Sequence, residues 1–155
     1  MRDYIIMTDS CCDLSQQEVE ELELTVLPLS FTIEGKTLLN TPDHADLSPE
    51  EFFKKIAEGA DCTTSAVNVG QFTDAMEKVL QEGKDILCVC FSSALSTTYQ
   101  SACIAAEDLR EKYPEAKILV IDSLSASRGQ GMLLYRAVRE RREKNLTIDE
   151  LDAYV

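Results

Sequence analysis

Three predominantly apolar segments of strand length constrain the fold more than any other feature of the sequence. They are residues 4–8 (YIIMT), 86–91 (ILCVCF) and 117–121 (KILVI). None of them alternates between apolar and polar residues, so we expect both faces of each strand to be buried. Stretches with helical periodicity separate them, and such alternation is typical of parallel sheets. The sequence therefore predicts an α/β fold with a mainly parallel sheet flanked by helices on both faces.

Helix start signals mark the stretches between these strands. Ser15 with Glu18 is a capping-box pattern, and Ser48 followed by Pro49 and Glu51 is a strong helix start. Residues 25–33 and 37–39 are β-prone, whereas residues 62–69 have the composition of a polar loop. The helices expected from these patterns cover residues 15–22, 49–58, 69–82, 97–112 and 128–144, with a last one beginning at 147.

Length and charge limit the possible functions. The chain has 155 residues, which fits one domain of ordinary size. Its formal net charge of −13 argues against nucleic-acid binding, which needs clustered Lys and Arg, and against steady attachment to anionic membranes. No stretch approaches the roughly 20 apolar residues of a membrane span, and residues 1–7 lack a signal-peptide pattern. We therefore expect a cytoplasmic protein without stable membrane insertion.

The residues that usually bind metals are few and poorly spaced. The six cysteines form no CxxC pair, and His44 is the only histidine. A zinc site is therefore not expected. Cys88 and Cys90 lie in an apolar run and are expected to be small buried hydrophobes. Cys11 and Cys12 lie in a loop without a neighbouring basic group that would lower a thiol pKa. We expect neither a metal nor a cofactor.

Loops rich in hydroxyl groups follow each of the three apolar strands. They cover residues 8–10 (TDS), 92–98 (SSALSTT) and 122–127 (DSLSAS), and a fourth cluster, residues 63–65 (TTS), also precedes a helix. In open parallel sheets, ligands bind at the carboxyl ends of the strands. Helix N-termini at that edge offer free N–H groups and partial positive charge, which suit an anion. Hydroxyl donors together with these groups favour a site for a carboxylate.

Several other kinds of site are less consistent with these loops. The chain has no GxxxxGK[ST], GxGxxG or GxSxG motif, and Gly129-Gln130-Gly131 is only a GxG. A catalytic triad would have to use His44. Asp9 and Asp122 could form a general acid/base pair, although aspartates at strand ends more often shape loops. The serines and threonines could also serve only as helix N-caps.

The order of these motifs resembles the DegV family of fatty-acid-binding proteins. The resemblance rests on Thr8-Asp9-Ser10 before 13–14 (DL), on Thr64-Ser65 before Phe72, and on two later segments. Those segments are residues 92–102 (SSALSTTYQSA) and residues 121–123 (IDS), the latter followed by Gly129 and Gly131. The first of the two is the most specific part, and the match spans nearly the whole chain.

The resemblance implies that a long-chain fatty acid is the bound ligand and that the chain is not an enzyme. It places the carboxylate at Thr64 and Ser96, with a possible further pocket at Ser10, Ser65, Ser93, Thr97 and Ser123. It also implies a bacterial protein of phospholipid metabolism that presents the acid to a fatty-acid kinase, which forms the acyl-phosphate. The alternative function is a hydrolase or transferase that uses the same strand-end cleft.

The chain departs from the family pattern in two ways. Thr97 stands where the family usually has glycine, which would allow a closer backbone approach or a positive φ. Family members are also about twice as long, and their second domain covers the lipid. We therefore expect residues 1–155 to form a single amino-terminal domain, with the lipid-covering domain absent from this chain.

Overall fold

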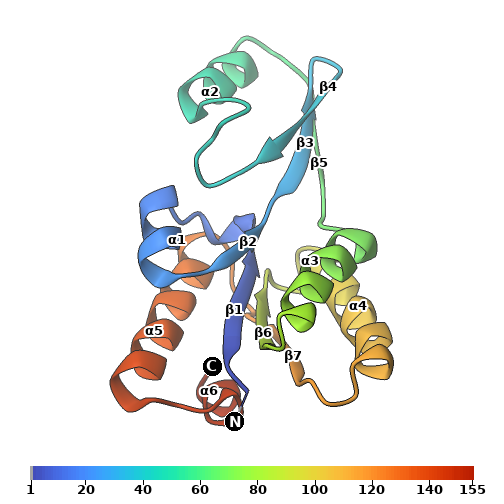
Figure 1. The fold of residues 1–155 in the computed structure, drawn as a ribbon. Coiled ribbons are helices and arrows are strands. Elements are labelled where there is room, and N and C mark those ends of the chain that lie inside the picture. Colours follow the sequence, from blue (N-terminus) through green and yellow to red (C-terminus); the bar gives the residue numbers. More distant parts are fainter. Residues whose placement is uncertain (1) are drawn as a thin grey trace.

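The computed structural model describes residues 2–155 and contains two sheets. The larger sheet has four parallel strands in the order β2 (Thr25–Leu27), β1 (Tyr4–Asp9), β6 (Asp85–Cys90) and β7 (Ile118–Asp122). Helices cover both of its faces: α1 (Gln16–Leu22), α5 (Arg128–Lys144) and α6 (Ile148–Tyr154) on one side, α3 (Val69–Gln81) and α4 (Thr98–Lys112) on the other (Figure 1). These elements form the body of the molecule, and they confirm the predicted fold class.

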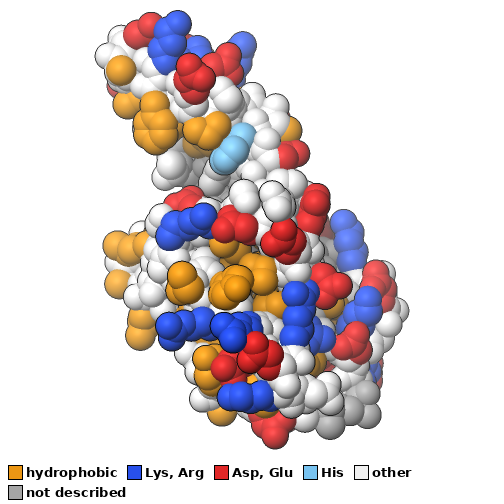
Figure 2. Space-filling view, turned by 90° about the vertical axis from the view of Figure 1, so that its left-hand side faces the viewer, with side chains coloured by type: hydrophobic (Ala, Val, Ile, Leu, Met, Phe, Trp, Pro, Cys, Tyr) orange, Lys and Arg blue, Asp and Glu red, His pale blue; other side chains and the backbone are white. Residues whose placement is uncertain are grey.

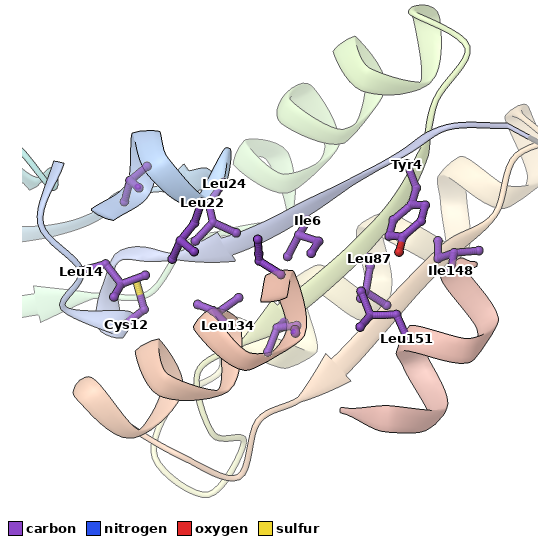
Figure 3. Close-up of a cluster of buried hydrophobic side chains, with 14 residues drawn as sticks. Tyr4, Ile6, Cys12, Leu14, Leu22, Leu24, Leu87, Leu134, Ile148 and Leu151 are labelled. Carbon is purple, nitrogen blue, oxygen red and sulfur yellow. The ribbon is translucent and has the colours of Figure 1, made fainter. Parts of the chain in front are cut away.

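Alternate residues of the central strands belong to two separate cores. Tyr4, Ile6 and Leu87 pack with Leu134 of α5 and with Ile148 and Leu151 of α6 (Figure 3). The neighbouring side chains on the same strands, Met7, Ile86 and Cys88, pack on the opposite face with α3 and α4. Because side chains alternate across a strand, burial of both faces produces a continuous apolar run.

The smaller sheet is antiparallel and belongs to a lobe, residues 29–65, that projects from one end of the body (Figure 1). Its strands lie in the order β4 (Lys36–Asn40), β3 (Leu29–Ile33) and β5 (Cys62–Ser65), with α2 (Pro49–Ala57) beside them. The β-prone stretch 25–33 is thus divided at Pro28 between the two sheets. Residues 62–65 form a strand, so the loop predicted there is wrong. Thr63 and Thr64 have the branched side chains that strands favour. Both are exposed, so the segment lacks the apolar pattern by which a buried strand is predicted.

Capping residues begin several of the helices in the structure. Capping boxes begin α1 at Ser15, α3 at Asn68 and α6 at Thr147. Helix α4 begins at Thr98, one residue later than expected, and Thr97 contributes no side-chain cap. Among residues 2–155, no helix is both long enough and apolar enough to cross a membrane.

Candidate functional site

A cleft of about 900 Å³ lies between the lobe and the carboxyl ends of β1 and β6. Its walls come from the turn Ser10–Cys12, the loop after β6, the lobe strands and α2. Figure 2 shows the narrowing between lobe and body, with apolar side chains gathered on the part of the lobe that faces the body. The cleft is therefore at the edge of the sheet where the sequence predicted a ligand.

Three of the predicted site residues line this cleft, namely Thr64, Ser96 and Ser10. The other four predicted residues, Ser65, Ser93, Thr97 and Ser123, are not among the described residues that line it. Ser65 follows Thr64 directly on β5, and successive side chains of a strand point to opposite faces. Ser123 is buried and its hydroxyl already donates to the Ser125 carbonyl at 3.2 Å.

The Ser96 side chain is joined to the start of α4. Its Oγ accepts a hydrogen bond from the Thr98 N–H at 3.2 Å and lies 2.9 Å from the Thr98 Oγ1. Thr98 is fully buried, and either hydroxyl can be the donor of the second contact. Ser96 therefore has a capping role, yet its own hydroxyl hydrogen can turn to a ligand if Thr98 donates to it.

Aromatic side chains of the lobe form an apolar wall that sequence reasoning missed. The rings of Phe31 and Phe52 meet edge to face with centroids 5.4 Å apart, and Phe52 and Phe53 repeat this geometry. All three line the cleft, together with Phe91 and Leu95 of the body. Phe52 and Phe53 lie on α2, and only the fold reveals that they border the cleft. Hydroxyl groups and apolar surface thus occur in one cavity.

The two strand-end aspartates shape loops. Asp9 is fully buried and accepts hydrogen bonds from the Phe91 N–H at 2.7 Å and the Cys11 N–H at 3.1 Å. Burial raises the pKa of Asp9, against the lowering effect of these two bonds. Burial also tends to raise the pKa of Asp122, but hydrogen bonds from Ser93 and Leu124 leave it lowered. Neither aspartate lines the cleft, so the geometry favours the loop-forming role.

Groups with nucleophilic or metal-binding potential are poorly suited to those roles here. Cys11 and Cys12 line the cleft, but burial raises the pKa of their thiols to about 12 and about 11. Such thiols stay protonated at neutral pH and are weak nucleophiles. Within residues 2–155, no three His, Cys, Asp or Glu side chains are grouped as metal ligands.

Gly131 fixes the contact between α5 and the turn that carries Ser10. A Cβ atom at Gly131 would lie 2.7 Å from the Cys12 carbonyl oxygen and 3.0 Å from Leu14. We expect Gly131→Ala to lower the free energy of unfolding by about 1–3 kcal/mol, because the backbone must shift to admit the methyl group. Urea denaturation monitored by circular dichroism measures this change.

Gly129 provides the matched control for this prediction. A Cβ atom there would meet nothing closer than Ser125 at 3.7 Å, which is ordinary contact. Gly129→Ala gains helix propensity without strain, so we expect it to be neutral or stabilising by up to about 1 kcal/mol. Equal stabilities of the two variants would contradict the close approach at Gly131.

Comparison with known proteins gives consistent results. A family model described as "Uncharacterised protein, DegV family" matches residues 4–153. A DegV domain-containing protein of Clostridium perfringens is 39% identical over 155 residues, covering 100% of this chain and 53% of that protein. A relative from Lactococcus lactis is 40% identical over 138 residues, covering 89% of this chain and 47% of its own. The chain therefore spans about half the length of these relatives.

Solved structures share the fold across almost the entire chain. A DegV family protein from Thermus thermophilus, described as binding fatty acid, has a TM-score of 0.84 at 32% identity. The match covers 99% of this chain and 52% of that one. A stearic-acid-binding protein from Eubacterium ventriosum has a TM-score of 0.85 at 28% identity, covering 97% of this chain and 51% of that one.

Proposed function

The chain belongs to the DegV family, and from this premise we propose that it binds a long-chain fatty acid and holds the carboxylate with the hydroxyls of Thr64 and Ser96. The observation that carries the proposal is the single cleft that contains both hydroxyls and the aromatic wall of the lobe. Fatty-acid binding by the Thermus thermophilus and Eubacterium ventriosum proteins supports it.

The two hydroxyls have the chemistry that a carboxylate requires. Thr64 is exposed on β5, and within residues 2–155 its side chain has no hydrogen-bond partner. Ser96 can donate its hydroxyl hydrogen to a ligand. The buried Thr98 hydroxyl then donates its own hydrogen to the Ser96 oxygen. Each donor–acceptor step in such a chain polarises the next one. Backbone N–H groups at the start of α4 add further partial positive charge.

Apolar surface in the same cleft suits an acyl chain. Phe53 is 68% exposed and Leu95 is 66% exposed, although both are large apolar side chains. Full burial of one such side chain is worth about 1.5–3 kcal/mol, so a hydrocarbon ligand would gain by covering them. This cleft is open, and a second domain of the kind expected from family resemblance would cover the lipid.

The cellular role that we propose is to present the bound acid to a fatty-acid kinase. The kinase would carry the nucleotide and phosphorylate the carboxylate, so the binding protein needs no catalytic group of its own. A hydrolase or transferase is less favoured, because the cleft cysteines have raised thiol pKa values and the strand-end aspartates are engaged by backbone N–H groups.

Native mass spectrometry and calorimetry on the full-length protein test this proposal. We expect a long-chain acid to copurify with the protein. After delipidation, we expect stearic acid to bind roughly tenfold or more tightly than methyl stearate, since hydrogen bonds to a charged group are the stronger ones. Equal affinities for acid and ester would refute the carboxylate site, and hydrolysis of the ester would support the enzyme instead.

A further inference from the structure

Ser10 has a hydrogen-bond arrangement that differs from those of the other cleft hydroxyls. It is only 6% exposed, it begins the turn after β1, and it lines the cleft. Its Oγ accepts from the Leu29 N–H at 3.0 Å and from the Asn40 Nδ2 at 3.2 Å. Both donors belong to the lobe, so Ser10 joins the body to the lobe by two hydrogen bonds.

These two contacts determine what the Ser10 hydroxyl can still do. A serine hydroxyl has two acceptor lone pairs and one hydrogen to donate. A backbone N–H and an amide NH₂ are donors, so Leu29 and Asn40 occupy both acceptor positions. Within residues 2–155, no group accepts the remaining hydrogen. Because Ser10 lines the open cleft, this hydrogen is available to an acceptor on a ligand bound there.

Ser123, another buried serine in a loop at this edge of the sheet, has a different hydrogen-bond arrangement. Ser123 donates its hydroxyl hydrogen to the Ser125 carbonyl and accepts from the Ser125 N–H, so its hydroxyl is satisfied within its own loop. Ser10 instead accepts twice and donates to nothing in the described chain. The turn that holds it is fixed by Asp9, whose carboxylate accepts from the Cys11 N–H.

We propose that Ser10 is a third hydroxyl donor to the ligand carboxylate, with its hydrogen directed into the cleft by the two lobe groups that donate to it. This inference rests on the proposed function and extends it. It couples the ligand to the position of the lobe, because the atom that binds the carboxylate also joins Leu29 and Asn40 to the body.

The test compares Ser10→Ala with Ser123→Ala in the full-length protein, by calorimetric titration with stearic acid and with methyl stearate. Ser10→Ala removes the proposed donor, whereas Ser123→Ala removes a buried hydroxyl that bonds within its own loop and does not line the cleft. We expect Ser10→Ala to lower the acid-over-ester preference roughly tenfold or more, and Ser123→Ala to leave that ratio unchanged. If Ser10→Ala fails to fold, Ser10→Cys replaces it, because a thiol is a weak donor of similar shape.

Two outcomes are decisive and separable. If Ser10→Ala weakens acid and ester equally, Ser10 only joins lobe and body, and the inference is overturned while Thr64 and Ser96 retain their role. If the parent protein does not prefer acid over ester, the proposed carboxylate site fails, and the inference fails with it.

Discussion

Replacing Phe72 by alanine is expected to lower the free energy of unfolding by about 3–5 kcal/mol. Phe72 lies on α3, is 0% exposed, and packs in the core between that helix, α4 and the parallel sheet. Alanine would leave a cavity that the surrounding side chains fill only in part. Because domains of this kind are stable by about 5–15 kcal/mol, the loss would remove a large share of the total.

Phe53 is the matched control for this change. It is the same residue type on a helix, but it lies on α2 and is 68% exposed. Its edge-to-face contact with Phe52 is the main interaction lost, so Phe53→Ala should cost no more than about 1 kcal/mol. Guanidinium denaturation of both variants measures the difference. Similar losses for the two variants would mean that the core has been misplaced.

The double variant Thr64→Val with Ser96→Ala is expected to weaken stearic-acid binding by about two to four orders of magnitude. In the proposed site each hydroxyl donates one hydrogen bond to the carboxylate, and a hydrogen bond to a charged group is worth about 1.5–3 kcal/mol, or roughly ten- to hundredfold in affinity. Valine keeps the shape of threonine and removes only the donor. Titration of the single and double variants with the acid and with its methyl ester measures the effect.

The helix-capping interpretation predicts a different result for the same variants. Ser96 accepts from the Thr98 N–H, so Ser96→Ala should also lower stability by about 1 kcal/mol. Thr64 lies within β5 and caps no helix, so any loss of affinity in Thr64→Val cannot come from a lost cap. Unchanged acid affinity in both single variants would leave capping as the only role of Ser96.

The sequence predicted the parallel sheet because complete burial leaves an unmistakable pattern. The strands β1 and β6 lie between two cores, so almost every side chain in them is apolar. The strand β5 could not be predicted in this way. It pairs with β3 on one side, its side chains are largely exposed, and its polar sequence resembles that of a loop.

The hydroxyl-rich loops were easier to locate than the residues that face a ligand. Whether Thr64 or its neighbour Ser65 turns to the cleft depends on the pleat of a strand that the sequence did not predict. The role proposed for Ser10 depends on its contacts with Leu29 and Asn40, which lie 19 and 30 residues away in the chain. Such contacts follow from the placement of the lobe, which no local pattern encodes.

The lobe leaves and rejoins the body through two stretches of chain, at Pro28 and after Ser65. None of the fully buried members of either core comes from residues 29–65. Proteins open locally in contiguous cooperative units. Because the lobe shares no fully buried core residue with the body, we expect the two parts to open as separate units. Stability is then unevenly distributed: amide hydrogens of the lobe can exchange with solvent while those of β1 and β6 stay protected. Local opening of the lobe would then admit a bulky ligand to the cleft while the parallel sheet of the body stays folded.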